Sequence, residues 1–90
     1  MHLNELAQAL KTVGEENRLK ILCVIFNNKK ICVSDIAKEL AMSVAIVSHH
    51  LHIMERDGLL NPTQEGKCTF YQLPDKPFVS DLKKLICKYK

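Results

Sequence analysis

The feature that most constrains the fold is a short helical segment, a brief break and a longer helical segment in direct succession. Residues 31–40 place apolar side chains at helical spacing, and Ser34 is the expected N-cap of that short helix. After a two-residue break, Ser43 is positioned to cap a second helix, which Gly58 ends. This order predicts a helix-turn-helix over about residues 34–56.

The apolar period then changes from that of a helix to that of a strand. Residues 59–63 and 68–73 are the expected strands, and Gly66 in the turn between them suits a positive φ. Pro62 fits an edge strand, because proline cannot donate to a neighbouring strand. A wing hairpin over about residues 59–73, placed after a helix-turn-helix, is typical of a winged helix.

Helices are also expected on both sides of this unit. Residues 2–13 and 77–89 are amphipathic, and Leu19–Phe26 is apolar around most of the helical wheel, as in a central buried helix. The element order is ααααββα, an α+β fold that is mainly α. With 90 residues, the chain is expected to be a single domain with a thin core, a shortage that oligomerisation commonly relieves.

Composition narrows the function classes. The chain is 47% hydrophobic and 26% charged, and its net charge of +3 permits binding to nucleic acid without requiring it. No nucleotide-binding glycine motif, nucleophile elbow or zinc-protease motif occurs, so no enzyme is expected. There is neither a signal peptide pattern nor an apolar run long enough for a membrane, which makes a cytoplasmic protein the expectation.

Three histidines lie within four positions of the longer helix, but helical geometry separates them. Val47, Leu51 and Met54 form the apolar stripe, while His49 and His52 lie on the opposite face. That face is small and polar near its N-terminal end, as entry into a DNA major groove requires. Lys67 near the hairpin tip suits a phosphate contact. The alternative is a structural helical domain whose polar face is simply solvated.

Five segments, in order and at normal spacing, resemble the ArsR/SmtB repressors. They are L-K-T-V-G-E-E-N-R-L-K-I-L (10–22), I-C-V-S-D-I-A-K-E-L (31–40), V-S-H-H-L (47–51), E-R-D-G-L-L (55–60) and E-G-K-C-T-F-Y-Q-L (65–73). The resemblance implies a homodimeric winged-helix repressor joined through its first and last helices. It also implies binding to an inverted-repeat operator in double-stranded DNA, with release by a metal or other signal.

The same resemblance implies which side chains face the bases. They are Ser43, Val44, Ala45, Ile46, Ser48 and His49. Relatives often carry polar residues at positions 44–46, where this chain has Val-Ala-Ile. Apolar side chains contact thymine methyl groups but cannot form bidentate hydrogen bonds to guanine or adenine. We therefore expect weaker direct readout and greater reliance on Lys67, other basic residues and DNA shape.

Two kinds of inducing signal remain open. Relatives with a metal site at the start of the third helix carry Cys-Val-Cys-Asp, and Cys32 and Asp35 match it, but Ser34 replaces the second cysteine. A metal or metalloid inducer would then bind weakly, because soft ions favour several thiolates. Cys23 and Cys87 resemble the cysteines of the sulfide- and redox-sensing branch. Alternatively, Cys23 is a small buried apolar residue and Cys87 has no role.

Two other functions compete with the repressor. A winged-helix protein-interaction module, with no inducer and little sequence readout, is suggested by the apolar tip at Val44-Ala45-Ile46. A small metal-dependent hydrolase built on His49 and His52 has less support, because no third ligand or carboxylate base lies beside them in sequence.

Overall fold

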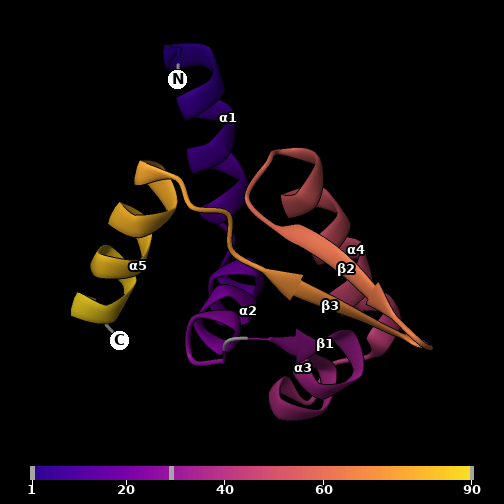
Figure 1. Ribbon diagram of the computed structural model, residues 1–90. Helices are drawn as coiled ribbons and strands as arrows, with labels where there is room; N and C mark the ends of the chain where they lie inside the picture. The colour runs from indigo at the N-terminus through magenta and orange to yellow at the C-terminus, as the bar shows by residue number, and fades with distance from the viewer. Residues whose placement is uncertain (1, 29, 90) are drawn as a thin grey trace.

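Five helices and one three-stranded sheet make up residues 2–28 and 30–89, the part of the chain that the computed structural model describes (Figure 1). The elements, in order, are α1 (Leu3–Val13), α2 (Glu16–Phe26), β1 (Ile31–Cys32), α3 (Val33–Leu40), α4 (Val44–Arg56), β2 (Asn61–Glu65), β3 (Cys68–Gln72) and α5 (Pro77–Tyr89). The expected order of helices and wing is confirmed, with the short strand β1 in addition.

Helix α2 is the central helix, as its apolar sequence predicts. Its side chains Ile21, Leu22 and Ile25 are at most 2% exposed and pack with residues from α1, α3, α4 and the sheet. Glu15 caps the helix, since its carboxylate accepts a hydrogen bond from the backbone N–H of Arg18 at 3.0 Å. None of the described helices has the length and apolar character needed to cross a membrane.

Helices α3 and α4 form the predicted helix-turn-helix. Ala41 ends α3 in the left-handed conformation, at φ 55°, and the N–H of Met42 bonds back to the carbonyl of Ala37 at 2.9 Å. Ser43 caps α4 as expected, because its Oγ accepts a hydrogen bond from the N–H of Ile46 at 3.1 Å. Val47, Leu51 and Met54 are fully buried, which fixes the rotation of α4 about its axis.

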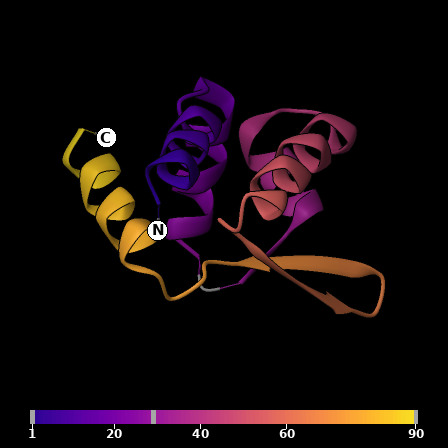
Figure 2. The same cartoon turned by 90° about the horizontal axis from the view of Figure 1, so that it is seen from above.

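The sheet is antiparallel, in the order β1-β3-β2. Strand β3 therefore pairs on both edges, with β1 at Ile31 and with β2 along the whole hairpin. The hairpin turns through Gly66, at φ 59°, and extends beside α4. Figure 2 shows α5 and the hairpin tip at opposite ends of the molecule.

Two boundaries differ from those that the sequence predicts. Ser34 is not an N-cap: α3 begins at Val33 with Cys32 as its cap residue, because the chain leaves β1 directly into the helix. The first wing strand begins at Asn61 rather than at residue 59. Leu59 and Leu60 are instead 3% and 1% exposed in the core, and they anchor the hairpin to the helices.

Candidate DNA-binding surface

The N-terminal part of α4 presents small and apolar side chains to solvent. Val44 and Ile46 are each 51% exposed, which is unusual for large apolar residues on a helix whose inner face is fully buried. The remaining predicted base-facing residues are Ser43, Ala45 and His49, all exposed, and Ser48, half-buried. The six residues thus lie at the N-terminal end of α4, where five of them are exposed to solvent.

The wing supplies a cation at the same end of the molecule. Lys67 is exposed in the β2–β3 turn, and both views place this turn toward the N-terminal end of α4 and away from α5 (Figures 1 and 2). The turn is ordered by local hydrogen bonds: Gln64 Nε2 donates to the carbonyl of Gly66 at 3.0 Å, and Thr69 Oγ1 donates to Gln64 Oε1 at 2.7 Å. The turn that carries Lys67 is therefore ordered by side-chain hydrogen bonds.

Of the three clustered histidines, His50 is the one that accepts a hydrogen bond from a side chain of α2 in the described part of the chain. Arg18 Nε donates to His50 Nδ1 at 3.2 Å, and its Nη1 donates to the carbonyl of Thr12 at 3.2 Å. His49 and His52 are exposed on the outer face, as the helical wheel predicts. The histidine cluster is thus divided between one packing position and two exposed positions. Among the described residues, no group of three His, Cys, Asp or Glu side chains could hold a metal ion.

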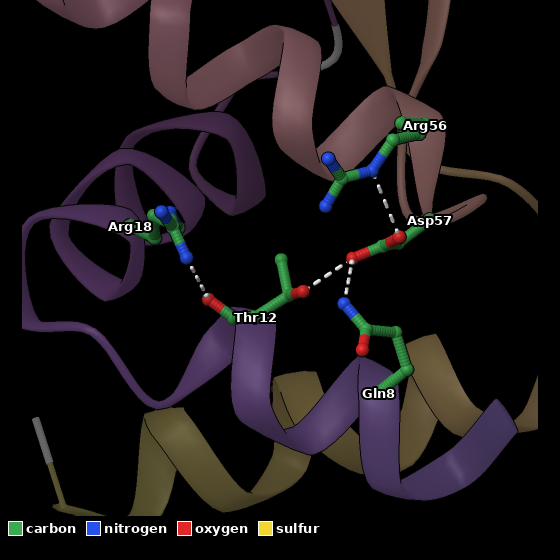
Figure 3. A network of polar contacts seen from close by, with 5 residues as sticks. All are labelled: Gln8, Thr12, Arg18, Arg56 and Asp57. Carbon is green, nitrogen blue, oxygen red and sulfur yellow. Dashed lines mark hydrogen bonds and ion pairs between the residues drawn. The ribbon is translucent and has the colours of Figure 1, made fainter. Parts of the chain in front are cut away.

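A polar network joins the C-terminal end of α4 to α1 (Figure 3). The carboxylate of Asp57 accepts hydrogen bonds from Thr12 Oγ1 and from Gln8 Nε2, and it pairs with Arg56. Partial burial acts to raise the pKa of Asp57, but these three donors outweigh it and hold the pKa below its ordinary value. Together with Arg18, the network ties α4 at two points along its length to α1 and α2.

The sequence gives little sign of this network. Thr12 and Asp57 are 45 residues apart, and Arg18 and His50 are 32 apart. The only available signal is Thr12 itself, a polar residue beside Val13 on the inner face of α1, where it is 2% exposed. A buried threonine of this kind requires a hydrogen-bond partner.

The predicted inducer-binding cysteines lie in two separate regions. Cys23 is half-buried and lines a groove between α1, α2 and α5, whereas Cys87 is exposed on α5 and does not line that groove. Cys32 is buried in β1, and Asp35 is exposed in the first turn of α3. All four cysteines are free thiols.

These features define a winged helix-turn-helix domain with a surface suited to duplex DNA. Residues 15–61 match the family model described as "Bacterial regulatory protein, arsR family". This match covers more than half of the chain, and the chain belongs to that family. It is a winged-helix transcriptional regulator rather than an enzyme.

Individual relatives agree with this assignment. The transcriptional activator HlyU of Vibrio cholerae is 34% identical over 82 residues, covering 88% of this chain and 75% of HlyU. Its solved structure superposes with a TM-score of 0.87 at 31% identity, covering 99% of this chain and 97% of that one. The structure of the transcriptional repressor PagR of Bacillus anthracis gives a TM-score of 0.82 at 30% identity, covering 93% and 94% of the two chains.

A third relative is the cadmium resistance regulatory protein CadC of Listeria innocua. It is 38% identical over 61 residues, which cover 68% of this chain but only 51% of CadC. The chain therefore spans three quarters of HlyU but about half of CadC.

Proposed function

We propose that this chain represses transcription as a homodimer that binds an inverted-repeat operator. The proposal rests on one observation: the exposed N-terminal part of α4 and Lys67 lie at the same end of the molecule. In this arrangement α4 enters the major groove, with Val44 and Ile46 against base edges. Lys67 then contacts a backbone phosphate from the neighbouring groove.

The opposite end of the molecule supports the homodimer. Leu3, Leu10, Leu85 and Tyr89 on α1 and α5 are 51–82% exposed, although they belong to the apolar faces of amphipathic helices. Three of these residues line an almost wholly apolar groove, here called the α1–α5 groove: Leu10, Leu85 and Tyr89. The groove is also lined by Val13, Leu19, Cys23, Leu82 and Ile86. A second copy would cover these side chains, and its two-fold symmetry would match an inverted repeat.

The proposal is tested by measuring affinity for a fluorescent inverted-repeat fragment from the chain's own upstream DNA, at several salt concentrations. We expect binding that weakens steeply with salt, because Lys and Arg contacts release counterions from the phosphates. Absence of binding to any such fragment at low salt would contradict the proposal.

The dimer is tested with Leu85→Asp, which places a charge in the α1–α5 groove. We expect a monomer in sedimentation and a loss of operator binding, while the helical content is kept because Leu85 is 55% exposed in the monomer. The control is Ser80→Asp, which adds the same charge at another exposed position of α5. A Leu85→Asp protein that remains dimeric would place the interface elsewhere.

A protein-interaction module is the second candidate, favoured by the half-exposed Val44 and Ile46. It predicts that His49→Ala combined with Lys67→Ala leaves the activity in cells intact. The repressor predicts that this double substitution derepresses a reporter placed behind the operator.

For the inducing signal we propose thiol chemistry between Cys23 and Cys87. Support comes from Cys23, which is half-buried in the α1–α5 groove beside Leu85 and Ile86, close in sequence to Cys87. A link between these cysteines would alter α5 at the proposed interface. A metal or metalloid bound at Cys32 and Asp35 is the competing signal. Operator affinity of the Cys32→Ser chain after sulfide or peroxide, and of the Cys23→Ser/Cys87→Ser chain after arsenite or a divalent metal, distinguishes the two.

A further inference from the structure

Two cysteines from distant parts of the chain lie on one face of the sheet. Cys32 of β1 pairs with Phe70 of β3, and Cys68 lies two residues before Phe70 on the same strand. Because alternate residues of a strand point to the same face, Cys68 and Cys32 are diagonal neighbours across the β1–β3 pair.

This face is the one turned away from the main core. Ile31 and Tyr71 point to the other face, where they are 7% and 3% exposed and belong to the apolar core. Cys32 is also only 6% exposed, yet it is not part of that core cluster. Its burial is therefore separate from that core cluster. Cys68 is half-buried, so the pair is open to small molecules on the Cys68 side.

The strand register brings the two thiols to neighbouring positions on this face. Ser34 Oγ donates a hydrogen bond to Cys32 Sγ at 3.5 Å. Cys68 is the more accessible sulfur of the two, because Cys32 is buried and Cys68 is half-buried.

We propose that Cys32 and Cys68 are a redox-active pair that a hydroperoxide converts to a disulfide, which fastens β3 of the wing to the start of α3. In the first step the sulfur of Cys68 attacks the peroxide and breaks its O–O bond, forming a sulfenic acid and releasing water or an alcohol. The thiolate of Cys32 then attacks that sulfur, and the S–O bond breaks to release hydroxide. With hydrogen peroxide, two thiols and one peroxide give one disulfide and two waters.

Closure of this disulfide changes the geometry of the wing. Diagonal neighbours in an antiparallel pair stand about 7–8 Å apart at Cα, whereas a disulfide holds the two Cα atoms within about 6.8 Å. The bond therefore draws β3 toward β1 and shifts the hairpin that carries Lys67. We expect oxidation to lower operator affinity on the order of tenfold, within the range typical of coupling between two sites.

The cysteines are well placed for an unambiguous test. Trypsin leaves each cysteine on its own peptide: residues 21–29, 31–38, 68–83 and 85–88, since Lys76 precedes a proline and resists cleavage. The full chain is treated with stoichiometric hydrogen peroxide, alkylated, digested without reduction and analysed by mass spectrometry. We expect peptides 31–38 and 68–83 to appear joined, with the loss of two hydrogens, and to separate after reduction.

Two variants and one denaturing control make the result specific. In Cys23→Ser/Cys87→Ser the joined peptide is expected to persist, and adding Cys68→Ser to that background is expected to abolish it. The same oxidation in concentrated urea should lose the preference for this pairing. A native chain that links only Cys23 to Cys87, or that oxidises Cys32 and Cys68 without joining them, would overturn the proposal.

The effect on DNA is measured in the Cys23→Ser/Cys87→Ser background, before and after oxidation. This part rests on the proposed DNA-binding function, whereas the cross-link is detected without DNA, so the two failures are distinguishable. A joined pair with unchanged operator affinity would refute the regulatory role. Failure of the reduced protein to bind any operator would instead refute the proposed function.

Discussion

Arg18 donates its Nε hydrogen to Nδ1 of His50, at 3.2 Å, and thereby ties the middle of α4 to the start of α2. The acceptor nitrogen must be unprotonated for this hydrogen bond to exist. Partial burial lowers the pKa of His50 below its ordinary 6.5, and the charges of Arg18 and His49 lower it further, against an opposing effect of Glu15. His50 is therefore a packing residue of α4 that is neutral while it accepts this hydrogen bond.

This pairing predicts a pH dependence of stability. Because the pKa of His50 is lower in the folded chain than in the unfolded chain, the unfolded state takes up the proton first as the pH falls. The stabilisation is complete above about pH 6.5 and is lost as the pH falls through the folded pKa. Urea unfolding at pH 5 to 8 should show this loss.

The controls separate His50 from its neighbours. His50→Gln keeps an acceptor for Arg18 without titrating, so it should flatten the pH dependence. His52→Gln changes an exposed histidine and should leave the dependence as it is. An unchanged slope in His50→Gln would show that another group is responsible.

Thr12→Val is expected to lower the free energy of unfolding by about 1 to 2 kcal/mol. The substitution keeps the shape of a 2%-exposed side chain but removes a donor to the Asp57 carboxylate, which retains Gln8 and Arg56. Thr63→Val, at an exposed position of β2, is the matched control and should change stability by less than about 0.5 kcal/mol. Chemical denaturation measures the free energy of unfolding of both variants. Equal losses of stability would argue against a stabilising role for the Thr12–Asp57 hydrogen bond.

Ala41→Gly is expected to stabilise the protein by about 0.5 to 1 kcal/mol. Ala41 adopts φ 55° at the turn between α3 and α4, a conformation that glycine reaches without steric conflict. Ala45→Gly, at an exposed position of α4 with ordinary helical backbone, should instead be destabilising. The opposite signs would appear in thermal unfolding, and a destabilised Ala41→Gly would refute the argument.

Lys67→Ala should reduce the slope of log affinity against log salt by about 1 per subunit, because one phosphate contact is lost from each wing. Lys84→Ala removes the same charge from α5, at the end of the molecule away from the wing, and should leave the slope unchanged. Fluorescence anisotropy over a salt series gives both slopes, and identical slopes would exclude Lys67 from the interface.

Ile46→Ala should weaken binding to an operator containing thymine by roughly fivefold, from the lost apolar contact with a methyl group. Replacing thymine by uracil in the operator removes the same methyl groups. The wild-type chain should then lose affinity, whereas the affinity of the Ile46→Ala chain should not fall any further. Additive losses from the two changes would mean that Ile46 and the methyl groups do not meet.

Helical periodicity predicts the parts of this chain that depend on local sequence. Val47, Leu51 and Met54 repeat at helical spacing and are all fully buried, because one rotation of α4 satisfies all three. Strand β1 is not predictable in this way, since Ile31 and Cys32 are too few to show a period. Its existence depends on pairing with β3, almost forty residues later.

The same limit applies to the polar contacts of the site. The hydrogen bonds of Arg18 to His50 and of Thr12 to Asp57 depend on how α1, α2 and α4 pack, which no single segment encodes. Ser34 illustrates competition between two local choices. Its sequence context favours an N-cap, but the pairing of β1 brings Cys32 to that position, and the Ser34 hydroxyl bonds to the Cys32 sulfur instead.

The strand order β1-β3-β2 has an entropic consequence for recognition. A hairpin joined to its domain only at the two ends would lose conformational freedom when its tip met DNA, and that loss would weaken binding. In this chain β3 is hydrogen-bonded on both edges, and Lys30 holds Glu65 near the tip through an ion pair. The wing has already lost that freedom during folding, so a contact of Lys67 with a phosphate would add to affinity with little entropic offset.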